Sequence, residues 1–154
     1  MLEVVNLTEI KIDTKFLQKV AQAAFAVLGI KEEVSLVFIG DAKMKELNKK
    51  YRGKNKTTDV LSFKELSEIF ICLSQAKRQA KFYNSPHPPL KLRGGAPPLK
   101  LRGGWEGLSP LNCELTRLLA HGIVHLQGYD HAKSAREAKR MFSVEEKILK
   151  KIIV

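Results

Sequence analysis

Residues 109–131 read SPLNCELTRLLAHGIVHLQGYDH, and the fold and chemistry expected of the chain depend on this stretch. Ser109 followed by Pro110 is typical of a helix start, because serine caps the first free amides and proline fits the first turn. Leucines and an isoleucine then recur at helical spacing. The stretch therefore predicts a long helix that has an apolar face and runs into a cluster of histidines.

The spacing of the histidines predicts a metal site. His121 and His125 are one helical turn apart, so both imidazoles project from one face. Gly128 can adopt the left-handed conformation that ends a helix, and the returning chain then brings His131 to the same place. Three imidazoles leave the fourth tetrahedral position open, as in a catalytic zinc site. We therefore expect His121, His125 and His131 to bind one Zn²⁺ ion, which would lower the pKa of bound water to about 7.

The pattern HxxxHxxGxxH resembles the ligand skeleton of the metzincin proteases, with one important difference. Those enzymes carry a glutamate general base directly after the first histidine, and this chain has Gly122 there. The nearest carboxylate in sequence is Asp130. It could orient a histidine ligand or simply form a turn, and the residues leave both roles open.

The rest of the chain alternates short apolar runs with amphipathic segments. Strands are predicted at 3–10, 34–39, 59–63 and 69–73, and helices at 14–28, 42–50, 74–82, 110–126 and 134–151. The strand–helix–strand order over residues 3–39 indicates a βαβ crossover. The expected fold class is α+β (mixed α/β), with a small four-stranded sheet packed against about five helices, one of them a zincin-like metal helix.

One segment breaks this pattern. The octamer PPLKLRGG occurs at 88–95 and again at 97–104. Its prolines and paired glycines oppose both helix and strand, so we expect a flexible insertion at about 83–107 within a single domain covering 1–154. The repeats are also basic, and an RGG-like nucleic-acid arm is the alternative interpretation.

The composition of the chain indicates which kinds of partner it binds and in which compartment it works. The chain has 27 Lys+Arg against 16 Asp+Glu, a net charge of +11, which favours a polyanion such as nucleic acid or an anionic membrane face. A spanning helix needs about 18 apolar residues in a row, and neither such a run nor a signal peptide is recognised, so we expect a cytoplasmic protein that does not enter membranes. Cys72 and Cys113 are expected to be buried free thiols.

Three blocks resemble the YbeY-type endoribonucleases, which are bacterial rRNA maturation factors. They are HGIVHLQGYDH at 121–131, YRGKNKTTDVLSF at 51–63, and EIFIC at 68–72. The resemblance implies a zinc-dependent endoribonuclease that prefers single-stranded RNA. It also implies a role in 3′-end maturation of the small-subunit (16S) rRNA and in ribosome quality control, with the ribosome or ribosomal proteins as partners.

The resemblance also assigns residues. It makes the three histidines the metal ligands and Arg52 a residue needed for activity, which fits the ability of a guanidinium to hold a phosphate through two hydrogen bonds. Two features depart from the family pattern. The first is that Phe63 is followed by Lys64 instead of proline, with only residues 64–68 before the next strand. The second is the repeat insertion, which directly precedes the predicted metal helix.

The chemistry expected is metal-assisted cleavage of a phosphodiester, with either zinc-bound hydroxide or the RNA 2′-OH as the nucleophile. Two other functions remain open at this point. A non-catalytic ribosome-assembly factor with a structural zinc would bind RNA through its basic face, but the open coordination position argues against it. A metallopeptidase would share the histidine skeleton, but Gly122 supplies no base and the positive charge suits a polyanion better.

Overall fold

The computed structural model describes residues 1–81, 108–130 and 132–153, and its sheet has four strands. The strands are β1 (Leu2–Asn6), β2 (Val34–Ile39), β3 (Val60–Phe63) and β4 (Glu68–Cys72), in the order β1-β2-β4-β3. β1 and β4 both run parallel to β2, and β3 pairs antiparallel with β4 at the edge of the sheet. Together with the helices, this arrangement confirms the predicted α+β fold class.

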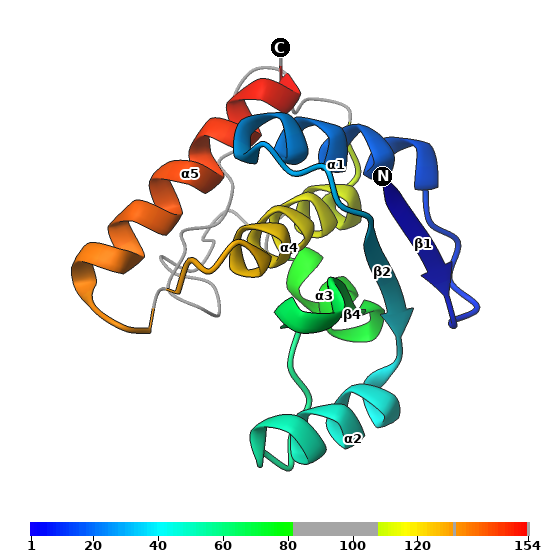
Figure 1. Ribbon diagram of the computed structural model, residues 1–154. Coiled ribbons are helices and arrows are strands. Elements are labelled where there is room, and N and C mark those ends of the chain that lie inside the picture. The colour runs from blue at the N-terminus through cyan, green and yellow to red at the C-terminus, as the bar shows by residue number, and fades with distance from the viewer. Residues whose placement is uncertain (82–107, 131, 154) are drawn as a thin grey trace.

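Five α-helices accompany the sheet in the described part of the chain. They are α1 (Thr14–Leu28), α2 (Asp41–Arg52), α3 (Leu73–Ala80), α4 (Pro110–Leu126) and α5 (Ala135–Ile153). Figure 1 shows α1, α4 and α5 grouped together, with α2 at the other end of the molecule. The βαβ crossover is confirmed, because α1 connects the parallel strands β1 and β2.

Local sequence explains where the main helices begin and end. The Asp13 side chain accepts a hydrogen bond from the Phe16 amide at 3.0 Å, and Gly29 ends α1 in the left-handed conformation. Ser109 caps α4 in the same way, accepting from the Asn112 amide at 3.1 Å. The predicted start of this helix at Ser109–Pro110 is therefore confirmed.

Several predicted boundaries were wrong, among them the end of β1, the start of α3 and the end of α2. β1 ends at Asn6 instead of Ile10, because the Asn6 side chain accepts from the Thr8 amide at 3.0 Å and donates to the Ile10 carbonyl at 2.8 Å, which turns the chain. α3 begins at Leu73 directly after β4, so Ser74 lies inside its first turn and does not cap it. α2 continues to Arg52, and Gly53 at φ +68 ends it.

The short connection between β3 and β4 forms a hairpin. Residues Lys64–Leu66 make a single turn of 3-10 helix, and Ser67 at φ 50 returns the chain into β4. The five-residue spacing noted in the sequence is therefore accommodated by antiparallel pairing of β3 with β4.

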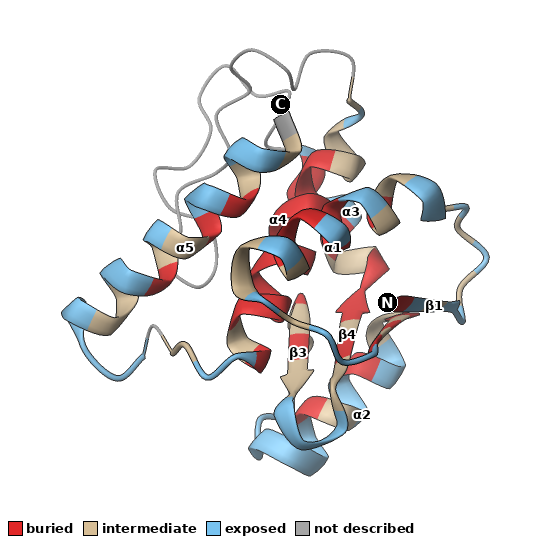
Figure 2. Cartoon of the chain, turned by 45° about the horizontal axis from the view of Figure 1, so that its top comes forward, coloured by how far each residue is buried: buried red, intermediate tan, exposed pale blue. Residues whose placement is uncertain are grey.

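The central helix of the fold is α4. Figure 2 shows it largely buried, and every residue from Cys113 to Val124 is buried. Both cysteines are buried free thiols, as predicted, and burial raises the pKa of Cys72 and of Cys113 to about 11. Among the helices formed by described residues, none has the length and apolar character needed to cross a membrane.

Gly122 allows α4 to approach the sheet closely. A Cβ atom at this position would lie 2.9 Å from Ile69 Cγ2 and 3.3 Å from Ser62 Oγ. The Ser62 hydroxyl donates to the Gly122 carbonyl at 3.2 Å, which ties β3 to the helix. Position 122 therefore faces the sheet, and a larger side chain there would meet buried atoms.

Two predictions concern residues outside the described part of the chain. The repeat insertion at about 83–107 is one of them, and His131 is the other. Both stay predictions.

Candidate functional site

Two of the three predicted metal ligands lie side by side on α4. His121 is buried, with 8% of its surface exposed, and His125 is half-buried one turn later. Their rings meet edge to face with centroids 4.5 Å apart, and the two Nε2 atoms are separated by 3.1 Å. The spacing predicted that both imidazoles share one helix face, and the structure places them so.

A different acceptor holds the Nδ1 side of each ring. Nδ1 of His121 donates to the Glu145 carboxylate on α5 at 2.6 Å, and Nδ1 of His125 donates to the Tyr129 carbonyl at 2.8 Å. Because these oxygens only accept, both Nδ1 atoms carry a hydrogen. In neutral rings, both Nε2 atoms then present lone pairs toward each other. A shared cation satisfies this arrangement, and so does protonation of one ring.

The separation of the two nitrogens also fits a metal. Two ligand nitrogens at about 2.0–2.1 Å from one tetrahedral zinc lie about 3.3–3.4 Å apart, and the observed separation is 3.1 Å. Within residues 1–81, 108–130 and 132–153, no group of three or more His, Cys, Asp or Glu side chains is placed to hold a metal. The third predicted ligand, His131, lies outside these ranges.

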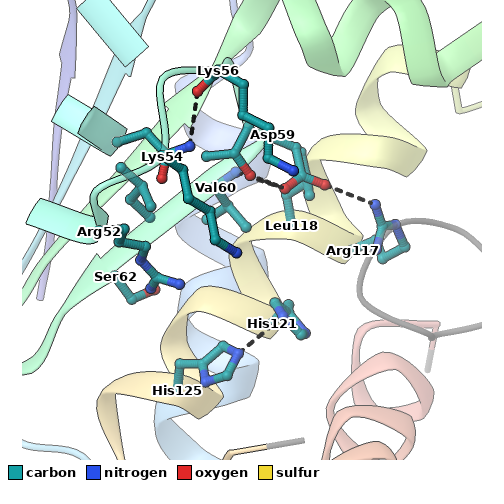
Figure 3. Close-up of a pocket in the computed structure, with 13 residues that line it drawn as sticks. Arg52, Lys54, Lys56, Asp59, Val60, Ser62, Arg117, Leu118, His121 and His125 are labelled. Carbon is teal, nitrogen blue, oxygen red and sulfur yellow. Dashed lines mark hydrogen bonds and ion pairs between the residues drawn. The ribbon is translucent and has the colours of Figure 1, made fainter. Parts of the chain in front are cut away.

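The histidines line a pocket of about 240 Å³ whose opposite side is basic. Figure 3 shows α4 contributing His121 and His125, while Arg52, Lys54 and Lys56 come from the end of α2 and the loop that follows. The three cationic residues are exposed. The predicted catalytic residue Arg52 and the predicted ligand pair therefore belong to one pocket, although about 70 residues separate them.

The basic loop is held against α2 by a buried side chain. Asn48 is 2% exposed, and its side-chain amide donates to the Lys56 carbonyl at 2.8 Å. The backbone carbonyl of Asn48 accepts a hydrogen bond from the backbone amide of Lys54 at 3.3 Å. These contacts fix the course of the loop beside the pocket and hold its cations near the histidines.

A buried polar cluster lies beneath the pocket. Arg117, which lines the pocket, contacts the Glu114 carboxylate at 2.5 Å and the Asp59 carboxylate at 3.6 Å. Gln79 donates to both carboxylates, at 2.7 Å to Glu114 and 3.3 Å to Asp59. The cluster connects α3, α4 and the start of β3, so it fixes the relative positions of the elements that form the pocket.

Sequence reasoning missed Glu145 and this polar cluster. A signal for Glu145 exists, because it falls in the apolar stripe of α5, between Met141 and Ile148, where a carboxylate is unexpected. Asp130 was left with two roles, and its carboxylate accepts from the Ala132 amide at 2.8 Å, which supports the turn.

These features define a class of protein: an α+β fold with a central helix that presents a histidine pair to a cationic pocket. The family model described as Endoribonuclease YbeY matches residues 4–89 and 106–153. The chain therefore belongs to the endoribonuclease YbeY family, whose name describes cleavage within RNA chains.

Individual relatives agree with this assignment. The chain is 42% identical over 126 residues to endoribonuclease YbeY of Thermodesulfovibrio yellowstonii, which covers 75% of this chain and 64% of that protein. It is 33% identical over 153 residues to endoribonuclease YbeY of Persephonella marina, covering 92% of this chain and 84% of that protein.

A solved structure has a similar fold. The solution structure of TM1509 from Thermotoga maritima matches with a TM-score of 0.60 at 22% identity, over 99% of this chain and 89% of that one. At this identity the likeness concerns the fold alone.

Proposed function

We propose that this chain is a zinc-dependent endoribonuclease that cuts single-stranded RNA in the pocket between α2 and α4. The observation that carries the proposal is the pair of opposed Nε2 atoms, 3.1 Å apart, in a pocket whose other side carries Arg52, Lys54 and Lys56. A metal site beside cations suits a substrate that is itself a polyanion.

The histidines and Glu145 form the metal-binding side of the pocket. His121 and His125 would hold the ion through Nε2, and we propose His131 as the third ligand. Glu145 and the Tyr129 carbonyl accept from the two Nδ1 atoms, which would make Nε2 the ligand atom of each ring. When bound, zinc supplies Lewis acidity for cleavage of the phosphodiester.

The α2 side of the pocket acts on the RNA. Arg52 can hold a phosphate through two parallel hydrogen bonds and offset the charge that develops during cleavage. Lys54 and Lys56 attract the neighbouring backbone. The nucleophile is either water or the RNA 2′-OH. A 2′,3′-cyclic phosphate on the product would identify the RNA 2′-OH as the first attacker.

We further propose that the substrate is the 3′ end of the small-subunit rRNA, within ribosome quality control, in the cytoplasm and with ribosomal proteins as partners. The sequence blocks shared with the YbeY-type endoribonucleases support this role. The net charge of +11 is compatible with it.

The packing of Gly122 argues against a metallopeptidase. A metzincin-like base would have to extend from this position, where even a Cβ atom would lie 2.9 Å from Ile69 Cγ2. A mutational test distinguishes the enzyme from the alternative function, which is a non-catalytic RNA-binding factor.

The test compares wild type with His125→Ala, using elemental analysis for zinc and a single-stranded RNA for cleavage. We expect about one zinc per wild-type chain, and we expect the variant to lose both the metal and cleavage, because one ligand is gone. His87→Ala is the matched control, since His87 lies outside the predicted ligand set, and it should keep both properties.

Two outcomes would contradict the proposal. Cleavage that persists after zinc is lost would place the activity elsewhere. A metal-free variant that binds RNA and restores rRNA processing in cells would favour the non-catalytic assembly factor.

A further inference from the structure

A second basic groove lies on α5, outside the pocket described above. It has a volume of about 390 Å³ and is lined by Tyr129, Arg136, Lys139, Arg140, Ser143, Val144 and Lys147. The residues from α5 recur at intervals of three and four, so they form one stripe along the helix. Four of them are cationic and exposed, and no lining residue is acidic. We call this stripe with Tyr129 the α5 groove.

Carboxylates near the groove leave most of its charge in place. Arg140 contacts Glu137 at 3.3 Å, and this is an exposed pair of the kind that contributes little. In the described part of the chain, α5 also pairs through Glu146 with Lys150 at 3.3 Å and through Glu145 with His121 at 2.6 Å, and none of these residues lines the groove. The groove therefore presents a concave positive surface to any anion in solution.

Tyr129 connects the α5 groove to the histidine pocket. Its carbonyl accepts from Nδ1 of His125 at 2.8 Å, and Arg140 lies over its ring, 5.9 Å from the centroid. Thus a residue that lines the groove also holds one of the proposed metal ligands. Figure 1 shows α5 and α2 well apart, on different sides of α4, the helix that carries the two histidines.

We propose that the α5 groove binds the sugar-phosphate backbone of the RNA on one side of the cleaved bond, while Arg52, Lys54 and Lys56 bind it at the bond itself. A row of cations along a groove is suited to single-stranded nucleic acid, because the cations follow the phosphates of the backbone. This inference rests on the proposed function. It adds a surface that contacts the longer RNA strands and takes no part in the cleavage reaction itself.

The test uses Lys139→Gln/Lys147→Gln, which removes two charges from the groove without touching Arg140 or Tyr129. The control is Lys15→Gln/Lys31→Gln, two exposed lysines outside both basic surfaces, so that net charge falls equally. Each protein is assayed on single-stranded RNAs of about four and about sixteen nucleotides, a range typical of single-strand binding sites.

We expect the groove variant to raise KM for the long RNA about tenfold with kcat unchanged, and to leave cleavage of the short RNA unaltered. The slope of log Kd against log salt concentration should decrease by about 0.7 for each lost phosphate contact. The control variant should match wild type on both RNAs. Thermal unfolding of both variants confirms that they are folded.

Binding is also measured with a fluorescent 2′-deoxy version of the long strand, and gel electrophoresis confirms that this strand is not cut during the measurement. This separates the two proposals, because failure of wild type to cleave would overturn the enzyme function while the binding comparison still reports on the groove. Equal loss on short and long RNA would overturn the groove as a separate contact. Unchanged binding by the groove variant would also overturn it.

Discussion

Glu145 and His121 lie 24 residues apart in the chain, and their side chains meet at 2.6 Å. A carboxylate that accepts from Nδ1 sets the ring's tautomer and orientation, which is how many metal-binding histidines are held. The neighbouring residue Glu146 is exposed and pairs with Lys150 on the outside of the helix. Two adjacent glutamates on α5 thus have different environments, and only the buried one reaches the proposed metal site.

Replacing Glu145 should weaken zinc binding. We expect Glu145→Gln to lower zinc affinity about tenfold, because it removes the charge but can keep an acceptor, and Glu145→Ala to lower it up to about 100-fold. Competition with a chromogenic chelator measures the affinity, and Glu146→Gln is the control that should match wild type. A reduced melting temperature with unchanged zinc affinity would mean that Glu145 serves packing alone.

At the scale of elements, the decisive contact is between α4 and the sheet. Gly122 lets the helix backbone lie against Ile69 of β4, while the Ser62 hydroxyl of β3 donates to the Gly122 carbonyl. His121 directly precedes Gly122 and His125 follows it within one turn of α4, so this contact sets how far the two histidines stand from β3 and the pocket. Glycine is needed here for close approach, because the residue lies within a regular helix.

Gly122→Ala should destabilise the protein. Overpacking in a core costs about 1–3 kcal/mol, and the better helix propensity of alanine returns about 1 kcal/mol, so we expect a net loss of about 1 kcal/mol. Urea unfolding measures it. In a double-mutant cycle, Ile69→Ala should remove the penalty, because Cγ2 is the atom in the way. Additive effects of the two substitutions would contradict this explanation.

At the scale of the whole molecule, the fold brings together in one pocket two groups of residues that lie far apart in the sequence. The end of α2 and its loop supply cations, and α4 supplies histidines, with β3 between them in the pocket lining. The buried cluster of Asp59, Glu114 and Arg117 joins the elements beneath. If α4 binds the metal and α2 binds the RNA, the two tasks should be separable by mutation.

Arg52→Ala tests this division. We expect kcat/KM for RNA cleavage to fall about 100-fold, the usual effect of losing one donor to a developing charge, while zinc content stays at the wild-type value. Arg52→Lys should recover part of the activity, since it restores charge without the bidentate geometry. Lys49→Ala removes a cation of α2 that does not line the pocket, and it should behave as wild type. Loss of zinc in Arg52→Ala would show that the two sides are not independent.

Sequence pattern was enough to predict the order of strands and helices, the start of α4 and the shared helix face of His121 and His125. These are local properties, governed by hydrophobic period, capping residues and one helical turn. It also carried the family resemblance, which the comparisons confirm. The wrong end of β1 at Asn6 came from short-range side-chain hydrogen bonds that compete with the strand. The starts and ends of α3 and α2 differ by one or two residues, the range within which helix ends are generally uncertain.

Contacts between residues far apart in the sequence could be seen in three dimensions but not predicted from the chain. Sequence pattern places Glu145 on a helix, but its contact with His121 depends on how α5 packs against α4. The same holds for the Asp59–Glu114–Arg117 cluster, for the meeting of Arg52 with the histidines in one pocket, and for the sheet-facing role of Gly122. Such contacts are set by the packing of whole elements, which periodicity along the chain does not encode.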